Sequence, residues 1–410
     1  MPSSFAVVPV SFQVALLNTV LNGVSAIFLR RITVATLLRP KKTEGGKGVG
    51  GTWLDELPPP PPPRHGGRKG EDREEDVRLR LRREVGAVLL MWLMSPTAVF
   101  TVVAYTESIF SCLTFAGLHF LLLSSEESRS LVAATKEAGA VFCFSLAGWA
   151  RSNALLYVGF LLYPIFLQVF FFNTYRRRCI QCHGSSKLCR RWPSIGRCVV
   201  LLLEILAICA PYLCMTYFCF TRFVPLWDSA TKLNTDGHFW SFYGWIQKRY
   251  WDVGFLASYR MKNLSNVFIA APIVFFALRG FLLFHVLPVF AKVSTSVPNE
   301  SAGSGNGGRR NKAIEKKTPR SYFTSTFRIV EGLVQSSNTV YLVAVIFIGV
   351  TMVHVNVVNR FIMSSPALYW IWARQLVWDP WGGCTIVMLR IFAAWTCIGA
   401  LFFPNGMPWT

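Results

Sequence analysis

Apolar residues collect in long blocks along this chain instead of alternating with polar residues. A membrane-crossing α-helix needs about 20 mostly apolar residues, with a range of roughly 17–25, because the hydrocarbon core of a bilayer is about 30 Å thick. Five blocks meet that length: Val7–Leu29, Ala154–Phe172, Cys198–Phe220, Val340–Val358 and Thr385–Phe403. The pattern therefore predicts an all-α polytopic membrane protein.

Four further apolar blocks are shorter or interrupted by ionisable residues: Ala87–Val103, Tyr105–Leu123, Leu131–Trp149 and Val267–Phe290. Lys136 and Glu137 lie near the start of the third, and the fourth contains Arg279 and His285. With these blocks included, we expect about nine spans that form one multispan membrane domain over residues 1–410.

The composition changes the picture in two ways. The chain is 52% hydrophobic and 15% charged, whereas soluble domains carry about 25% charged residues. Its 42 Lys and Arg against 21 Asp and Glu give a net charge of +21, which by itself would suggest a nucleic-acid partner. The positions of the charges argue against that partner, because three loops between apolar blocks hold fourteen, seven and eight basic residues: Arg30–Glu84, Thr174–Arg197 and Ala291–Val334.

Short loops rich in Lys and Arg stay on the cytosolic side of a membrane. With nine spans the three basic loops fall on one face, so we place them in the cytosol and Met1 in the lumen. A basic face beside anionic lipid accounts for the charge. We expect membrane lipids as partners and no nucleic acid.

Two cytosolic segments have compositions typical of disorder. Residues 40–85 combine the Gly-rich run PKKTEGGKGVGG, the polyproline run Pro58–Pro63 and the charged run EDREEDVRLRLRREVG. We expect a disordered cytosolic insertion whose charged end forms a helix that leads into the next span. Residues 291–335, rich in Gly, Ser, Asn and Lys, are predicted to form a second disordered cytosolic loop.

Cysteines cluster in the second basic loop, where Cys179, Cys182, His183, Cys189 and Cys198 begin with a Cys-x-x-Cys spacing. Such spacing can hold zinc. The last cysteine opens an apolar block and basic residues crowd the loop, so incidental or palmitoylated thiols explain the cluster better. We expect no metal and no cofactor.

Short polar and aromatic segments mark the opposite, lumenal face: Ala104–Ser108, Ala150–Ala154, Thr221–Asn266 and His354–Asp379. Polar groups at the ends of spans are expensive to leave unpaired, so they are commonly paired or functional. Residues 221–265 form the longest of these segments, and we treat it as the lumenal motif segment.

Four stretches resemble the PIG-V family of GPI mannosyltransferases, in the same order along the chain. Phe242–Pro272 is similar to the lumenal signature of the family through Ile246-Gln247, Tyr250-Trp251, Val253-Gly254-Phe255-Leu256 and Asn266-Val267-Phe268 before Pro272. The other three are SPTAVFTVVAYTES, WARSNALLYVGFLLYP and HVNVVNRFIMSSPALYW, at Ser95–Ser108, Trp149–Pro164 and His354–Trp370. In the last stretch Asn356 stands where the family has Gln.

The resemblance implies a multispan endoplasmic-reticulum glycosyltransferase of the GT-C type. Its reaction would transfer the second mannose, α-1,6-linked, from dolichyl-phosphate mannose to the mannosyl-glucosaminyl phosphatidylinositol precursor of the GPI anchor, on the lumenal side. A small membrane subunit is left open as a further partner. The alternative from another class is a non-catalytic membrane protein, meaning a transporter, a flippase or an inactive fragment of the enzyme.

The chain departs from the family pattern at two places. Family members begin with another membrane helix and a lumenal loop in which an acidic residue beside Trp is the presumed catalytic base. This sequence opens at Met1 with what resembles the second helix, so we expect an N-terminally truncated or divergent member. Asp252 replaces a family Asn and is a poor candidate for the base. The base is left unassigned, with Glu107 as the remaining candidate.

An inverting sugar transfer needs a carboxylate to accept the hydroxyl proton and donors to hold the leaving phosphate. Arginine suits phosphate because its planar donors bind two oxygens at once. Each assignment has a structural alternative, namely a helix cap for Glu107, interfacial snorkelling for the basic residues and a headgroup belt for the tryptophans. By resemblance, the residues expected to bind substrate are Arg151, Asn153, Gln247, Lys248, Tyr250, Trp251, His354 and Arg360.

Overall fold

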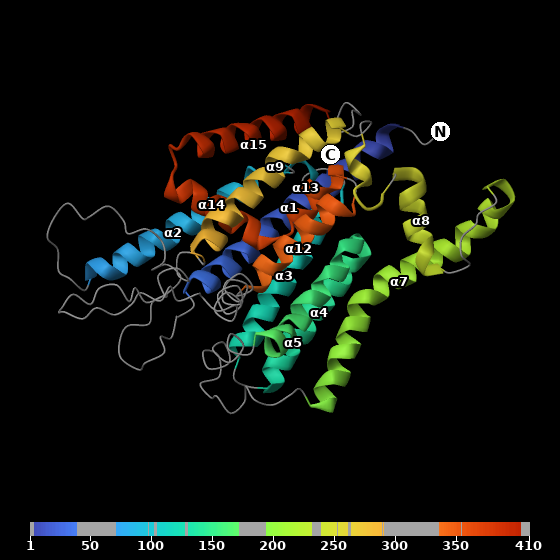
Figure 1. Cartoon of the computed structure of the whole chain (residues 1–410), viewed down its shortest axis with the longest axis horizontal. Coiled ribbons are helices and arrows are strands. Elements are labelled where there is room, and N and C mark those ends of the chain that lie inside the picture. The colour runs from blue at the N-terminus through green and yellow to red at the C-terminus, as the bar shows by residue number, and fades with distance from the viewer. Residues whose placement is uncertain are drawn as a thin grey trace, which may run out of the picture.

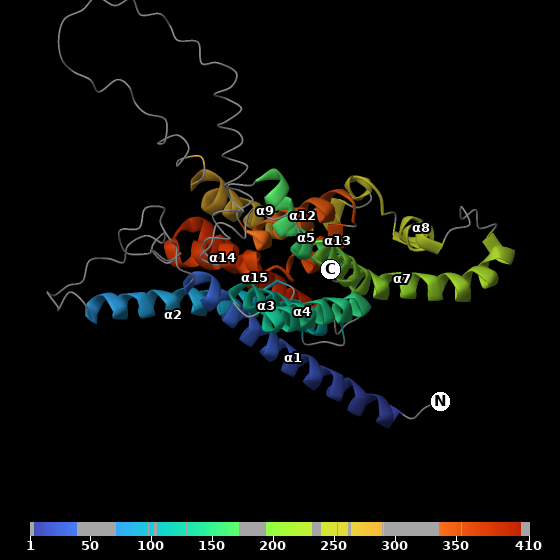
Figure 2. The same ribbon diagram turned by 90° about the horizontal axis from the view of Figure 1, so that it is seen from below.

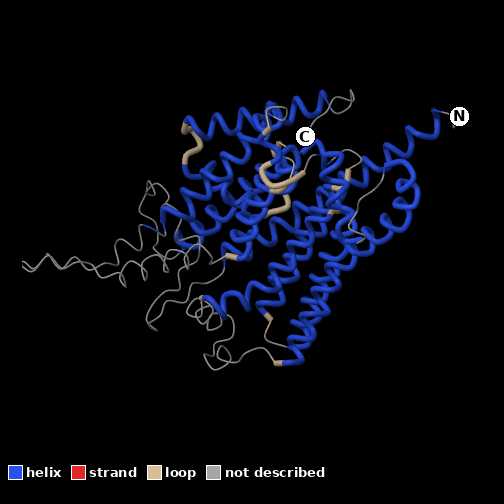
Figure 3. Tube along the Cα trace, turned by 45° about the vertical axis from the view of Figure 1, so that its right-hand side comes forward, coloured by secondary structure: helices blue, strands red, loops and turns tan. Residues whose placement is uncertain are grey.

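The computed structural model describes most of the chain. Its described residues are 4–38, 71–96, 98–101, 105–127, 130–171, 194–231, 239–251, 253–260, 264–288, 290, 336–353 and 355–402. Over these ranges the chain forms helices joined by short loops and contains no strand (Figure 3). The predicted all-α class is confirmed for this part of the chain.

Twelve α-helices are labelled in Figure 1. They are α1 (Ser4–Leu38), α2 (Glu71–Leu93), α3 (Glu107–Glu126), α4 (Ser130–Ala150), α5 (Val158–Phe170), α7 (Ile195–Thr231), α8 (Phe239–Trp251), α9 (Leu264–Phe281), α12 (Ser337–Thr351), α13 (Val355–Ile362), α14 (Pro366–Trp378) and α15 (Gly383–Phe402). Three 3₁₀ turns, η2 (Ala98–Thr101), η3 (Ser152–Tyr157) and η5 (Ala257–Tyr259), and one π-turn, η7 (Leu282–Val286), complete the described secondary structure.

Seven described helical segments are long and apolar enough to cross a bilayer: Gln13–Leu38, Glu107–Glu126, Leu131–Ala150, Ser152–Phe170, Ile195–Phe223, Val267–Val286 and Gly383–Phe402. They correspond to seven of the nine predicted spans. The polytopic prediction is confirmed, and the count of nine is not.

The two remaining predicted spans break for different reasons. The apolar block that begins at Ala87 is helical in α2 only as far as Leu93, and η2 (Ala98–Thr101) follows. The block Val340–Val358 is interrupted, because α12 ends at Thr351 and α13 begins at Val355. An apolar helix of 15 residues is about 22 Å long at 1.5 Å per residue, which is shorter than the hydrocarbon core.

The segment expected to be a disordered insertion is helical at its end. Residues 71–85 lie in α2, as the charged run predicted. Val77, Leu81, Val85 and Leu89 recur every four residues and pack on Leu37 of α1, since this spacing gives a helix one apolar face. Residues 40–70 and 291–335 lie outside the described residues.

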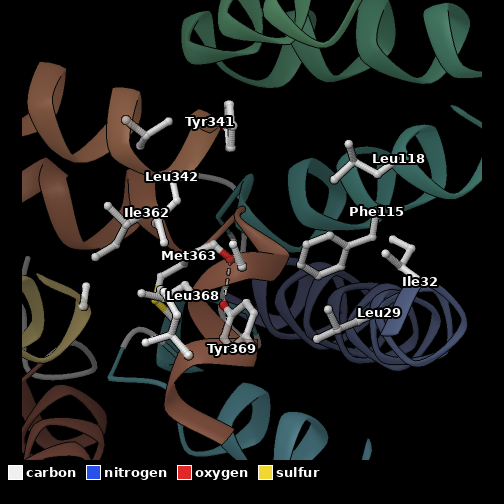
Figure 4. Packing of buried hydrophobic residues seen from close by; sticks show 14 of the residues in the cluster. Leu29, Ile32, Phe115, Leu118, Tyr341, Leu342, Ile362, Met363, Leu368 and Tyr369 are labelled. Carbon is white, nitrogen blue, oxygen red and sulfur yellow. Dashed lines mark hydrogen bonds between the residues drawn. The ribbon is translucent and has the colours of Figure 1, made fainter. Parts of the chain in front are cut away.

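The centre of the bundle is one apolar cluster in which α1, α3, α12, α13 and α14 meet (Figure 4). Leu29 and Ile32 of α1 face Phe115 of α3, and all three are at most 2% exposed. Tyr369 of α14 reaches the same core and donates its hydroxyl to the Met363 carbonyl at 2.7 Å. Small residues let neighbouring helices approach closely: a Cβ on Gly117 of α3 would lie 2.5 Å from the Phe144 ring of α4.

The helix α7 lies at the edge of the bundle, with α4 on one side and the aromatic helix α8 near its far end (Figures 1 and 2). Tyr212 and Phe220 of α7 contact Tyr243 and Phe242 of α8 edge to face. In Figures 1 and 3 the end of α1, the start of α2 and the start of α7 lie on one side of the bundle. The helix α8 and the N-terminal end of α1 lie on the opposite side. Because these ends border predicted cytosolic loops, we expect α8 to lie toward the lumen.

Candidate functional site

The candidate site is built around Glu107, the first residue of α3. An acidic residue in the first turn is favoured by the positive end of the helix dipole. The next residue, Ser108, fixes the approach of the chain because its hydroxyl donates to the Thr101 carbonyl of η2. Glu107 is only 6% exposed, which a helix-capping role alone does not require.

Two arginines from distant parts of the chain converge on this carboxylate. Arg151, directly after α4, donates from Nη1 to Oε1 of Glu107 at 2.5 Å. Arg360 of α13 donates to the same oxygen from Nε and also forms an ion pair with it through Nη2. The sequence predicted each of the three residues separately, and the structure brings them together. We call them the Glu107 cluster.

The charges of the Glu107 cluster do not cancel. Two guanidinium groups and one carboxylate leave a formal charge of +1, and the second carboxylate oxygen, Oε2, is buried with no hydrogen-bond partner among the described residues. The side chains of Glu107, Arg151 and Arg360 are 8%, 10% and 20% exposed. A largely buried net charge is costly without a counter-ion, so the site is suited to an anion.

Aromatic rings surround both arginines. The Cζ atom of Arg360 lies 4.9 Å from the ring centroid of Phe100 and 4.8 Å from that of Tyr105. The Cζ atom of Arg151 lies 5.5 Å from the Phe361 centroid and 5.7 Å from the Phe110 centroid. Such cation–π contacts stabilise a guanidinium group and fix its plane. Burial lowers the pKa of Arg151 in spite of Glu107 beside it, but an arginine keeps its charge at any physiological pH.

Buried hydroxyl groups support the cluster from within the bundle. Thr114 of α3 shares a 2.6 Å hydrogen bond with Tyr157 of η3, and Tyr341 of α12 shares a 3.2 Å hydrogen bond with Ser364. The rings of Tyr157 and Tyr341 are 5.7 Å apart. These contacts tie α3, η3, α12 and the segment after α13 to one another, so they hold the elements that carry Glu107, Arg151 and Arg360.

Asn153 lies in η3, two residues after Arg151. The residue is 6% exposed, and neither its amide oxygen nor its amide nitrogen has a hydrogen-bond partner among the described residues. Buried amides are normally hydrogen-bonded. The predicted binding residue Asn153 therefore has both polar atoms available to a ligand.

The predicted residues of the lumenal signature lie apart from this cluster, on α8. Gln247 is partly buried, whereas Lys248 and Tyr250 are exposed on a helix that packs mainly against α7. Within the described residues, no hydrogen bond or ion pair joins Gln247 or Lys248 to Glu107. The backbone of Trp251 ends α8, while its side chain, His354 and Asp252 lie outside what the structure describes.

The segment after α8 is attached to the bundle through its backbone. The Leu256 amide donates to the Thr351 carbonyl at the end of α12, at 2.7 Å. Leu256 has a φ of 54°, in the left-handed region that a branched side chain rarely adopts. The Val253–Leu256 motif thus anchors the α8 segment near α13, which carries Arg360.

Sequence reasoning missed how the cluster is put together. It did not predict that Arg151 and Arg360 share one carboxylate oxygen, or that Phe100, Tyr105 and Phe361 cover the two guanidinium groups. The signal was present, since these three rings lie inside the motif stretches Ser95–Ser108 and His354–Trp370.

Most of the cysteine cluster, for which zinc was the weaker interpretation, lies outside the described residues. Cys198 is exposed, while Cys179, Cys182, His183 and Cys189 lie outside the described residues. The described ranges contain no group of three or more metal-ligating side chains.

Comparisons with known proteins add the family context. A family model described as "Mannosyltransferase (PIG-V)" matches residues 78–410. Similar relatives include "GPI alpha-1,6-mannosyltransferase 2" of Homo sapiens, 23% identical, and of Cricetulus griseus, 26% identical, and "GPI mannosyltransferase 2" of Drosophila melanogaster, 24% identical. The alignments cover 78%, 72% and 78% of this chain and 69%, 56% and 67% of those relatives. No solved structure matches significantly.

Proposed function

The chain belongs to the mannosyltransferase (PIG-V) family, and from that premise we propose that it transfers the second mannose, α-1,6-linked, to the GPI precursor at the lumenal face of the endoplasmic reticulum. The donor is dolichyl-phosphate mannose, and the acceptor is the mannosyl-glucosaminyl phosphatidylinositol lipid. The names of the relatives support the acceptor and the linkage. The chain spans 56–69% of the length of these relatives.

The observation that carries the proposal is the net charge of the Glu107 cluster. A sugar phosphodiester on a lipid carries one negative charge, which matches the formal +1 of two arginines and one glutamate. As the sugar leaves, negative charge grows on the phosphate oxygen that loses it. Guanidinium groups already in place stabilise that charge without reorganising, and their planar donors match the geometry of two phosphate oxygens.

In this proposal Glu107 positions the arginines. Its Oε1 holds both guanidinium groups side by side, where their charges would otherwise repel, and leaves the remaining donors of each to the phosphate. Oε2 is left to accept a hydrogen bond from a sugar hydroxyl. Glu107 is not assigned as the catalytic base, because its contacts in the structure explain a binding role.

The other motif residues complete the proposed substrate site. The free amide of Asn153, next to Arg151, is placed to bind sugar hydroxyls. Gln247, Lys248, Tyr250 and Trp251 come from the aromatic helix α8, whose anchor at Leu256 connects it to the region of Arg360. His354 precedes α13 in sequence, and we assign it to the same substrate site by its motif.

The test is restoration of GPI-anchored proteins at the surface of cells that lack the second mannosyltransferase. The 410-residue chain and any longer form encoded with it should be expressed separately, and the lipid precursors should be analysed in the same cells. We expect at least one form to convert the one-mannose precursor to the two-mannose precursor. Matched variants are Arg360→Lys in the cluster and Arg222→Lys on the exposed side of α7. Normal accumulation of both forms without conversion would exclude the proposed reaction in favour of a non-catalytic membrane protein.

A further inference from the structure

A second ion cluster lies in a groove between α4 and α7, outside the site described above. The groove has a volume of about 440 Å³. Its polar lining includes Glu137, Ser145, Arg197 and Glu204, and apolar side chains such as Leu203 form the rest. We call Glu137, Arg197 and Glu204 the groove cluster.

The charges of the groove cluster are also unbalanced, with the opposite sign. Arg197 donates from Nη2 to Oε1 of Glu137 at 2.5 Å and from Nη1 to Oε1 of Glu204 at 3.5 Å. Oε2 of Glu204 is buried and has no hydrogen-bond partner among the described residues. Two carboxylates and one guanidinium group leave a formal charge of −1, which a cation would neutralise.

The depth of the groove cluster decides which cation can reach it. Glu137 lies seven residues after the start of α4 at Ser130, and Glu204 lies nine residues after the start of α7 at Ile195. At 1.5 Å per residue these carboxylates are about 10 and 13 Å along their helices. Both carboxylates therefore lie inside the segments Leu131–Ala150 and Ile195–Phe223, which are long and apolar enough to cross a bilayer. An unneutralised carboxylate is expensive there, and a side chain carried by another membrane helix can supply the cation.

The surroundings of the groove cluster are suited to a second helix. Phe142 of α4 and Leu203 of α7 line the groove and are 64% and 60% exposed. Figure 1 shows α7 at the edge of the bundle, and the described residues place no further helix over the outer side of this groove. The apolar walls can pack against a helix while the carboxylates bind its basic residue.

We propose that the groove between α4 and α7 binds a transmembrane helix of a partner protein, which carries a lysine or arginine about 10 Å from the end of its span nearest the groove cluster. The basic side chain pairs with Glu204 and Glu137, and apolar residues of the partner pack on Phe142 and Leu203. This inference does not depend on the mannosyl transfer, because the Glu107 cluster lies beyond the other end of α4.

The experiment uses the full chain in lipid vesicles with a photo-crosslinking amino acid in place of Phe142. The probe is a synthetic polyleucine helix with one lysine seven residues from the end that lies nearest the groove cluster. A control helix has glutamine in place of that lysine. We expect at least about tenfold more adduct with the lysine helix. A photo-crosslinker in place of Phe275, exposed on α9, is the control position and should show no preference between the probes.

Variants in the groove cluster separate charge recognition from simple packing. Glu204→Gln keeps the pair of Arg197 and Glu137, and the triple variant Glu137→Gln, Arg197→Gln, Glu204→Gln removes every charge without leaving one unpaired. Both should accumulate normally and lose most of the preference for lysine. Equal adduct with both probes, or a preference that persists in the triple variant, would overturn the proposal.

The same photo-crosslinker in cells tests for a natural partner. The supporting result is an adduct that the triple variant abolishes and whose partner has a basic residue at the matching depth of a membrane span. Adducts only with lipid, or only with another segment of this same chain, would show that the groove cluster is satisfied in another way and would refute the proposal.

Discussion

The Glu107 cluster and the groove cluster use the same side-chain chemistry with opposite charge balance. Two arginines share one glutamate in the first, and two glutamates share one arginine in the second. Their surroundings differ as well. Aromatic rings surround the first inside the bundle, whereas the second lies in an open groove in which the side chain of Arg197 is 40% exposed.

The comparison shows that an ion pair inside a membrane protein should be judged by the charge it leaves over. A balanced pair is fully explained as structure. In an unbalanced group of three the sign of the surplus favours an anion at the Glu107 cluster and a cation at the groove cluster. The surroundings then determine whether a substrate or a neighbouring helix can bring that ion.

The largest effect is expected for Glu107→Ala. The substitution leaves two buried arginines facing each other, and removal of one partner of a buried ion pair destabilises a protein by about 3–5 kcal/mol. We expect mannose transfer in membranes to fall by at least about 100-fold, with reduced accumulation of the protein. Glu126→Ala, at the exposed end of the same helix, should change neither quantity. Near-normal transfer by Glu107→Ala would show that the shared carboxylate does not organise the site.

A smaller effect is expected for Arg360→Lys and for Arg151→Lys. Lysine keeps the charge but loses the planar donors that hold the carboxylate and a phosphate at once. We expect roughly tenfold lower transfer for each variant, equivalent to about 1.4 kcal/mol, with normal accumulation. Titration of the lipid-phosphate donor distinguishes weaker donor binding from a lower maximal rate of transfer. We expect weaker donor binding. An unchanged donor dependence would contradict phosphate binding by these residues.

A modest effect is expected for Phe100→Leu. The variant keeps an apolar side chain and removes the aromatic face over Arg360, and a cation–π contact contributes about 0.5–1 kcal/mol. We expect mannose transfer to decrease by roughly two- to fivefold. The same membrane assay measures this decrease. Phe275→Leu, on the exposed face of α9, is the matched control. Equal effects of the two substitutions would mean that the ring acts only through general packing.

The smallest catalytic effect is expected for the neutral triple variant of the groove cluster. Its residues lie away from the Glu107 cluster, so mannose transfer by purified protein should stay within roughly twofold of the unmodified chain, as expected for distant, independent sites. The variant leaves no charge unpaired, so its accumulation in cells should also stay normal. A large loss of activity per molecule would show that the two clusters are coupled.

Much of the fold could be predicted from the sequence because spans in a bilayer are governed by length and hydrophobicity. Seven predicted spans correspond to observed helices. The break between α12 and α13 could not be predicted in the same way, since Val340–Val358 is long enough for a span and contains few polar residues, among them His354 and Asn356. Tertiary contacts, such as the bond from Leu256 to Thr351, accompany the break.

The candidate site could be predicted as a set of residues but not as an arrangement. Glu107, Arg151 and Arg360 were identifiable because each is an ionisable residue in a motif at the end of an apolar block. Their common use of Oε1 depends on the packing of α3, η3 and α13, which no local pattern contains. The placement of Lys248 and Tyr250 on an exposed helix likewise depends on the packing of α8 against α7.

The separation of Glu107, Arg151 and Arg360 along the chain has a consequence for biosynthesis. Arg151 follows Glu107 by 44 positions, whereas Arg360 follows it by 253. At about 5–20 residues per second, a ribosome needs roughly 10–40 s to make the 209 residues between Arg151 and Arg360. During that interval the nascent protein holds a balanced pair of Glu107 and Arg151, and the surplus positive charge that suits an anion arises only when α13 arrives. A chain interrupted before α13 therefore has no net charge at this position. Quality-control factors for new membrane proteins meet no excess charge there until Arg360 completes the binding site.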